Sequence, residues 1–230
     1  MNYLIRGCCL VIGLMLFIAA SLPAQESKAR QTDVVKTDVG DLKITPINHA
    51  SLLLQWSGIA IYVDPTSQGD YTGLPKANLI LITDIHGDHL DPKAVAALKR
   101  DGKPETLIYA PEAAAKTIGD AVILRNGERR GVAGLAIGGT TTIEAVPMYN
   151  LTRGTKSGQP YHPQGRGNGY ILTLGRMRPR IYISGDTECI PEMKALKQID
   201  IAFMCMNLPY TQTPQEAAEC VKAFRPAIVY

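Results

Sequence analysis

The chain has 230 residues, 46% of them hydrophobic and 20% charged, which is enough apolar material for one large domain or two small ones. Its formal net charge of +3 is small and dispersed, so it gives no reason to expect a nucleic-acid partner. Internal repeats, heptad patterns and low-complexity tracts are absent from the sequence, which excludes fibrous and repeat architectures.

The first 24 residues have the layout of a secretory signal peptide. One positive charge in MNYLIRG precedes the apolar run CCLVIGLMLFIAA, and SLPAQES then turns small and polar. We expect cleavage near Ala24 and a periplasmic or secreted protein. The apolar run is shorter than the ~20 residues that a membrane span needs, so no stable span is expected after cleavage, although an uncleaved anchor is the alternative.

Three cysteines remain beyond the predicted cleavage site: Cys189, Cys205 and Cys220. Their odd number and loose spacing argue against a disulfide framework. Buried free thiols are therefore predicted.

Residues 25–40 are polar and predict a loose lead-in, followed by one domain over residues 41–230. Short β-rich runs broken by turn residues predict strands at 42–48, 51–56, 59–64, 77–83, 106–110, 121–125, 134–139, 141–147, 169–175, 180–186, 199–206 and 226–230. Periodic segments with capping residues predict helices at 90–100, 111–118, 191–198 and 213–224. Strands come first and strand–helix alternation follows, which predicts layered α and β structure.

The stretch TDIHGDHLDP, at residues 83–92, carries the strongest chemical signal. Residues two apart in a strand face the same side, so Asp84 and His86 would point together, and Gly87 lets Asp88 and His89 turn in after them. Imidazole nitrogen and carboxylate oxygen suit zinc, iron or manganese. A metal site is predicted, with Asp88 either binding or orienting a ligand; the alternative is a solvated turn.

A second carboxylate belongs with this motif. Asp186 ends the apolar run RIYIS, where its side chain would emerge at the edge of a sheet. An ordinary Asp–Thr turn is the alternative. We predict that Asp88 and Asp186 are the catalytic carboxylates, which hold and orient a nucleophilic water.

Together, these segments resemble the metallo-β-lactamase superfamily. TDIHGDHLDP is similar to its His-x-His-x-Asp-His loop, YVDP (with Asp64) to its first Asp-containing strand end, and YISGDT to its Gly-Asp-Thr strand end. The segment after Asp186 resembles the ascorbate-6-phosphate-lactonase-like branch. The resemblance covers most of residues 42–230. It implies an α+β fold, a four-layer αββα sandwich with the site at one rim of two packed sheets.

The resemblance also implies a ligand set and an activity. His86 would bind a first metal, Asp88 and His89 a second, and Asp186 would bridge two divalent ions, Zn²⁺ or else Mn or Fe. The implied activity is that of a metal-dependent hydrolase, which uses a metal-activated water on a small-molecule ester or lactone, amide or phosphodiester. A non-catalytic metal- or ligand-binding relative and a di-iron redox protein are the alternatives.

This sequence departs from the family pattern at three places. Asp84 stands at the first histidine; we predict that it ligates and tilts the metal preference toward manganese or iron, the alternative being a hydrogen bond to a ligating histidine. Asn150, a poor ligand, stands at a later histidine, and His162 in the same loop either replaces it or contacts substrate or nothing. The last family histidine would follow Tyr230, so we expect a chain truncated before the last C-terminal elements.

Further residues are candidates for lining the site. His49 would line it or cap a turn, and Asp64, Asn150 and Tyr210 are possible substrate or supporting contacts. A backbone nest for phosphate is a weaker possibility at residues 165–169, GRGNG. Tyr149, Tyr161 and Tyr210 could each supply an oxyanion donor, and the sequence does not select among them or give the oligomeric state.

Overall fold

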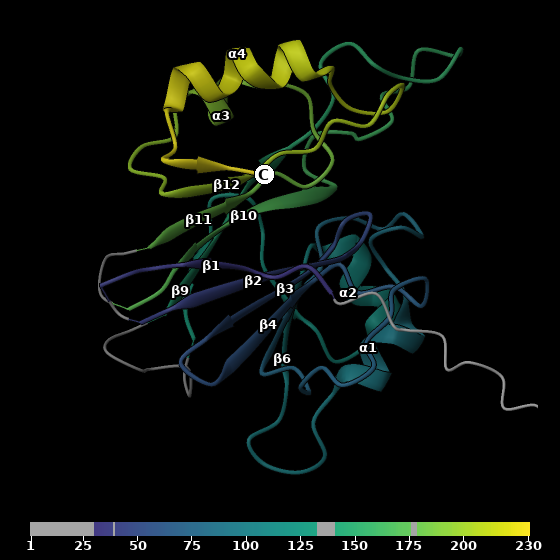
Figure 1. Ribbon diagram of the computed structural model, residues 1–230. Coiled ribbons are helices and arrows are strands. Elements are labelled where there is room, and N and C mark those ends of the chain that lie inside the picture. The colour runs from purple at the N-terminus through teal and green to yellow at the C-terminus, as the bar shows by residue number, and fades with distance from the viewer. Residues whose placement is uncertain (1–29, 39, 133–140, 176–178) are drawn as a thin grey trace, which may run out of the picture. The chain divides into compact units, whose positions relative to one another are not determined.

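Two β-sheets face each other in the computed structural model, which describes residues 30–38, 40–132, 141–175 and 179–230 (Figure 1). The predicted signal peptide at residues 1–24 and the predicted strand at 134–139 lie outside the described residues. All elements below belong to the unit formed by Gln31–Tyr230. Among the described residues, no helix is both long enough and apolar enough to span a bilayer.

The first sheet follows the chain order. Its strands are β1 (Asp33–Val35), β2 (Leu42–Asn48), β3 (Ser51–Trp56), β4 (Ile59–Val63), β5 (Leu79–Leu81), β6 (Leu107–Ala110) and β7 (Val122–Ile123). Strands β1 to β4 pair antiparallel, and β4 to β7 pair parallel. Strand β1 lies within the predicted lead-in at 25–40, so the prediction of a loose segment was wrong there: Val34 pairs with Lys43 of β2.

The second sheet has the order β13-β12-β11-β10-β9-β8. Its strands are β8 (Arg129–Gly131), β9 (Thr142–Met148), β10 (Gly167–Thr173), β11 (Arg180–Ile183), β12 (Ile201–Phe203) and β13 (Ile228–Val229). Strands β8 to β11 pair antiparallel, and β11 to β13 pair parallel. The sequence did not predict β8, whose residues are all exposed and carry no apolar pattern.

In the part of the chain that the structure describes, four helices cover the outer faces of the two sheets: α1 (Pro92–Leu98), α2 (Glu112–Ile118), α3 (Pro191–Lys194) and α4 (Pro214–Phe224). Alternation along a strand divides the core. On β4, Ile61 faces the cluster between the sheets, whereas Tyr62 faces the cluster beneath α1 and α2. On β11, Tyr182 likewise packs outward against α4. The predicted α+β, four-layer sandwich is confirmed.

Local sequence sets the helix ends largely as predicted. Asp91 accepts hydrogen bonds from the backbone of the first turn of α1, and Pro92 occupies the first helical position. Thr213 and Glu216 form a reciprocal capping box at the start of α4. The predicted helix at 191–198 is shorter and ends at Lys194.

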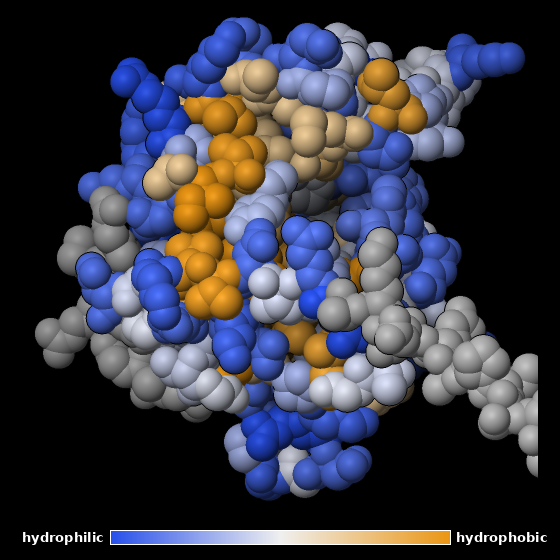
Figure 2. Space-filling model, in the orientation of Figure 1, coloured by the Kyte–Doolittle hydropathy of each residue, from blue (hydrophilic) through white to orange (hydrophobic). Residues whose placement is uncertain are grey.

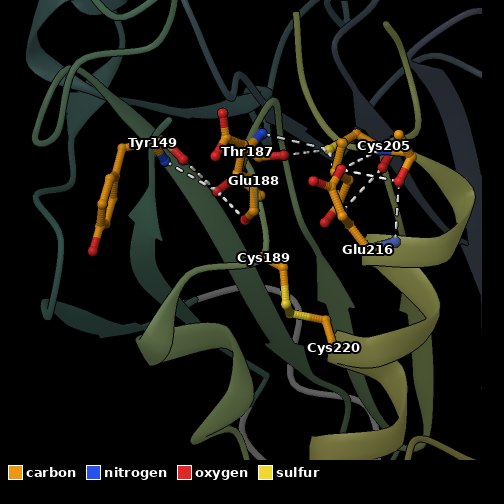
Figure 3. The surroundings of a disulfide bond; sticks show 9 residues. Tyr149, Thr187, Glu188, Cys189, Cys205, Glu216 and Cys220 are labelled. Atoms are coloured by element: carbon orange, nitrogen blue, oxygen red, sulfur yellow. Dashed lines mark hydrogen bonds between the residues drawn. A yellow bond between two sulfur atoms is a disulfide. The ribbon is translucent and has the colours of Figure 1, made fainter. Parts of the chain in front are cut away.

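A disulfide joins Cys189, which lies just before α3, to Cys220 on α4 (Figure 3). The prediction of free thiols at these two positions was wrong, while Cys205 is free. The two cysteines are 31 residues apart in sequence, yet their Cα atoms are 5.6 Å apart because α3 and α4 pack together. Such proximity depends on helix packing and is invisible in the spacing of the cysteines.

One face of the molecule carries a band of apolar side chains, which begins beside α4 and runs across the strands (Figure 2). Large apolar side chains are also exposed on edge strands of both sheets, at Val34 of β1 and Val229 of β13. Burial and the nearby carboxylate of Asp33 on β1 raise the pKa of the hydroxyl of Tyr230, which follows β13. These two sheet edges are therefore close together.

Candidate metal centre

The candidate site lies where strand ends of the two sheets meet. Asp64 directly follows β4, Thr83 and Asp84 follow β5, and Asp186 follows β11. At the start of β10 the backbone N–H of Asn168 donates to the carbonyl of Thr83 at 2.8 Å. The rim of the second sheet is thereby joined to the loop that carries the histidine motif.

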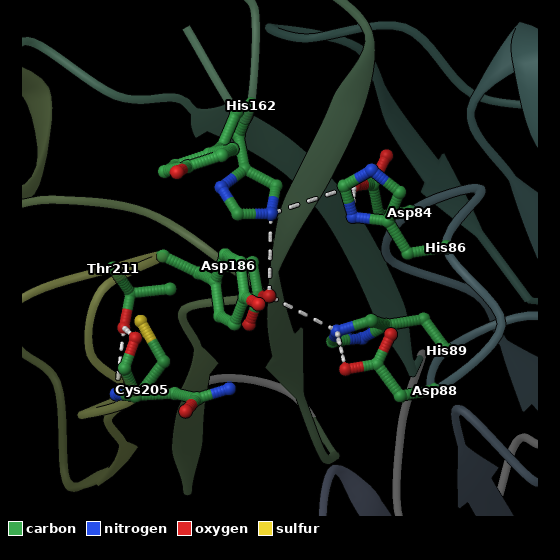
Figure 4. Close-up of polar contacts among 12 residues, drawn as sticks. Asp84, His86, Asp88, His89, His162, Asp186, Cys205 and Thr211 are labelled. Atoms are coloured by element: carbon green, nitrogen blue, oxygen red, sulfur yellow. Dashed lines mark hydrogen bonds and ion pairs between the residues drawn. The ribbon is translucent and has the colours of Figure 1, made fainter. Parts of the chain in front are cut away.

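Three predicted ligands form a first cluster, which we call the Asp88 group: Asp88, His89 and Asp186 (Figure 4). His89 Nε2 lies 3.3 Å from Asp186 Oδ2 and 3.7 Å from Asp88 Oδ2. This nitrogen is buried, and it makes no hydrogen bond to any described residue. Tetrahedral bonds of 2.0–2.1 Å place ligand atoms roughly 3.4 Å apart. The donor set and its spacing therefore fit one divalent cation.

Asp64 supports His89 from behind. Its Oδ2 lies 2.8 Å from His89 Nδ1 and accepts from the Thr83 hydroxyl at 2.6 Å, while its Oδ1 accepts from the backbone N–H of Thr83 at 2.7 Å. A proton on Nδ1 shared with Asp64 leaves the lone pair of Nε2 facing Asp88 and Asp186. Asp64, predicted as a possible substrate or supporting contact, thus lies where it orients the imidazole of His89.

Electrostatics in the Asp88 group favour positive charge. Burial alone would lower the pKa of His89, but the carboxylates of Asp64 and Asp186 outweigh it and raise this pKa well above the ordinary value. Burial would likewise raise the pKa of Asp186, but His162 and His89 hold it well below its usual range. The negative potential that retains a proton on His89 would also attract a divalent ion.

A second cluster, the Asp84 group, contains Asp84, His86 and His162. Asp84 Oδ2 lies 3.2 Å from His86 Nδ1 and 3.9 Å from His162 Nε2. His162 Nε2 is also 3.3 Å from Asp186 Oδ2, so His162 links the two groups. All six predicted metal ligands thus gather at one rim, although they come from three distant segments.

Arg166, which the sequence analysis did not single out, binds the Asp84 group directly. Its Nε and Nη2 donate to the two carboxylate oxygens of Asp84 at 3.1 and 2.7 Å, and Nη2 lies 3.2 Å from His86 Nε2. One signal was available: Arg166 is the only charged residue in the stretch 157–175.

Gly167, which follows Arg166, has a packing role. A Cβ atom on Gly167 would lie 2.8 Å from the carbonyl oxygen of Thr83 and 2.4 Å from a side-chain carbon of Met148. Only glycine lets β10 approach the loop after β5 this closely. The described contacts of the GRGNG stretch thus account for Gly167 without a bound phosphate.

Asn150 positions His162. Its Oδ1 accepts from the backbone N–H of His162 at 2.8 Å and lies 2.5 Å from His162 Nδ1. Glu188, a residue that sequence reasoning missed, accepts from Asn150 Nδ2 at 3.2 Å and from the backbone N–H of Arg153 at 2.6 Å. Asn150 thus orients the histidine that stands in its loop, as Asp64 does for His89.

The remaining candidates take different places. His49 Nε2 lies 3.1 Å from Asp88 Oδ2, so His49 does border the Asp88 group. The ring of Tyr210 packs edge-on against Tyr161, with centroids 5.1 Å apart. The Tyr149 hydroxyl donates to Glu192 on α3 at 3.0 Å, a contact that engages it outside both groups.

A cavity of about 360 Å³ opens beside the Asp88 group, a volume within the range of small-molecule sites. His49, His89 and Asp186 supply polar walls. Much of its lining is apolar and comes from both sheets, including Leu52, Val63, Ile183, Phe203, Met204 and Met206.

The fold and this geometry agree with the comparison with known families. Residues 43–230 match the model of the beta-lactamase superfamily domain. The chain belongs to the beta-lactamase superfamily. The predicted superfamily is confirmed, and membership of the ascorbate-6-phosphate-lactonase-like branch stays a prediction.

Relatives of this superfamily member are described as hydrolases that depend on a metal. A UPF0173 metal-dependent hydrolase of Methanopyrus kandleri is 28% identical over 204 residues, which cover 81% of each chain. A crystal structure of a protein described as a metal-dependent hydrolase, from Parabacteroides distasonis, is 48% identical, covers 87% of this chain and 86% of its own, and has a TM-score of 0.77. The metallo hydrolase Igni18 of Ignicoccus hospitalis, at 20% identity, 82% and 80% coverage and a TM-score of 0.64, shares the fold.

Proposed function

We propose that this superfamily member is an exported metal-dependent hydrolase of a small-molecule ester or lactone, amide or phosphodiester. The observation that carries the proposal is the buried Nε2 of His89, which makes no hydrogen bond to the described residues and faces the carboxylates of Asp88 and Asp186 beside a cavity. The hydrolase names of its relatives support the same reading.

Asp88, His89 and Asp186 would hold a divalent ion, with Zn²⁺ expected first and manganese or iron as alternatives. When bound, such an ion lowers the pKa of water to near 7 and polarises a carbonyl or phosphoryl oxygen. Asp64 keeps His89 in the tautomer that can ligate. Asp88 and Asp186 orient the attacking water, and His49 holds the carboxylate of Asp88.

The cavity supports a small substrate with an apolar part. Aliphatic and aromatic side chains of both sheets lie next to His89 and Asp186, so an apolar group would rest on them while its scissile bond faces the carboxylates. A lactone or other cyclic ester satisfies this description, in line with the branch that the sequence resembles.

The disulfide supports export. Cys189–Cys220 is of the kind that persists in oxidising compartments such as the periplasm or the extracellular space. Together with the signal-peptide pattern of residues 1–24, it favours a periplasmic or secreted location.

The test is metal loading followed by a hydrolysis screen. The purified chain is loaded with zinc, manganese or iron, its metal content is measured, and turnover of lactone, ester, amide and phosphodiester panels is followed with and without chelator. We expect chelator-sensitive hydrolysis of at least one class. Retention of less than roughly a tenth of an equivalent of every metal would overturn the proposal. Stable ion binding without any turnover would favour the non-catalytic relative.

A further inference from the structure

Hydrogen bonds to Asp84 and to the backbone of Tyr161 hold the side chain of Arg166 in place. Its guanidinium forms a two-point contact with Asp84, whose side chain is fully buried, and Nη2 also donates to the carbonyl oxygen of Tyr161 at 2.9 Å. The Arg166 side chain itself is 20% exposed. Planar two-point contacts of this kind fix a guanidinium more firmly than a single ion pair does.

The same Nη2 lies against two side chains of the Asp84 group. It is 2.7 Å from Asp84 Oδ2 and 3.2 Å from His86 Nε2, which belong to two of the side chains that a cation in this group would bind. A guanidinium keeps its charge at any pH that a folded protein experiences. A divalent ion on these atoms would therefore have to displace a permanent cation or lie against it.

The Asp88 group lacks such a cation. The described cationic contacts of Asp88 and Asp186 come from histidines alone, at His49, His89 and His162. Histidine can give up its proton to a metal ion, and arginine cannot. The two groups, similar in ligand types, thus differ in whether a permanent cation already neutralises their negative charge.

We propose that Arg166 takes the place of the second metal ion, so that the chain binds one divalent ion, at the Asp88 group. This rests on the proposed metal-dependent function. The Arg166 guanidinium supplies to Asp84 the positive charge that a second ion would supply. Asp84, which stands at a family histidine, then serves to hold the arginine.

The test counts metal ions per folded chain by elemental analysis after loading with excess zinc and desalting. The wild-type chain should hold about one equivalent, and Arg166→Gln about two, because a vacated Asp84 group has the ligands for a second ion. Arg125→Gln is the matched control. Its guanidinium likewise donates to a carboxylate, that of Glu112 at 3.0 Å, and this pair belongs to neither group, so about one equivalent should remain.

A second variant guards against misfolding, since Arg166→Gln leaves a buried carboxylate without its partner. The double variant Asp84→His, Arg166→Gln removes that buried charge and installs a neutral ligand, and it should hold about two equivalents. A folded double variant with one equivalent, or a wild-type chain with two, would overturn the role of Arg166 and leave the hydrolase proposal standing. A wild-type chain that holds none would overturn the hydrolase proposal instead.

Discussion

The Asp88 group and the Asp84 group begin within the same six-residue loop and use the same side-chain types, yet their surroundings differ. In the Asp88 group the buried nitrogen of His89 has carboxylates around it and no hydrogen-bond partner among the described residues. In the Asp84 group a guanidinium already contacts the carboxylate and an imidazole. Ligand types at the right spacing are therefore insufficient to count metal ions; the charges that neutralise them must be counted as well.

The largest effect should follow from Asp186→Ala. Asp186 Oδ2 is 3.3 Å from both His89 Nε2 and His162 Nε2, so its loss removes a ligand of the Asp88 group and its link to the Asp84 group. We expect kcat/KM to fall by about 10³-fold or more, with the fold retained. Steady-state kinetics would measure the fall in kcat/KM, and circular dichroism would check the fold.

The control for this prediction is Asp120→Ala, which removes an exposed aspartate paired with Lys99 far from the motif in sequence. Its kcat/KM should match that of the wild type. Normal turnover by Asp186→Ala would contradict the proposed role of the carboxylate.

Removing the disulfide should separate the stability of the fold from ion binding. Cys189 is next to Glu188, which supports Asn150 and, through Asn150, His162. His89 is held by Asp64 instead. For a sequence separation of 31 residues, the pair Cys189→Ala, Cys220→Ala should lower the free energy of unfolding by about 3.5 kcal/mol. Denaturant unfolding would measure this loss.

Ion affinity at the Asp88 group should stay within about threefold in the same disulfide-free variant, because Asp64 and Thr83 still fix His89. Calorimetric titration would measure it. A collapse of ion affinity in the folded variant would show that the ion depends on the His162 side of the site.

Asp64→Asn addresses the support of the Asp88 group alone. Asparagine keeps the shape of the side chain and removes the charge that faces His89 Nδ1 at 2.8 Å. Ion affinity should fall by about 10- to 100-fold, as is typical when the partner of a ligating histidine is changed. Competition with a chromogenic chelator would measure it, and unchanged affinity would mean that His89 does not ligate through an oriented Nε2.

Most of the fold could be predicted from local sequence, since most elements are marked by nearby residues. Asp91 with Pro92 and Thr213 with Glu216 identify helix starts because caps act within one turn of the chain. The edge strand at Asp33–Val35 was missed because it has three residues and lies in a polar segment, and its pairing with β2 comes from tertiary structure.

The ligands of the site could also be predicted, because strand ends carry them and parallel strands such as β4 and β5 end at the same edge. Their neutralising partners could not. Arg166 pairs with Asp84 across 82 residues, and Glu188 anchors Arg153 across 35. Such pairs are set by how β10 and the loop after β9 pack against the first sheet, which no local pattern encodes.

The smallest effect should come from His86→Ala. The His86 side chain is 40% exposed, and Arg166 Nη2 already lies 3.2 Å from its Nε2, so its imidazole is engaged by a cation that is part of the chain. If the ion is held by the Asp88 group, His86→Ala should leave both the stoichiometry and the affinity of the bound ion within about threefold of wild type. His89→Ala, the matched change three residues on, should abolish binding. If the wild-type chain instead holds two equivalents and His86→Ala loses one, His86 is a metal ligand. Both groups then bind metal, and they differ only in the arginine beside the Asp84 group.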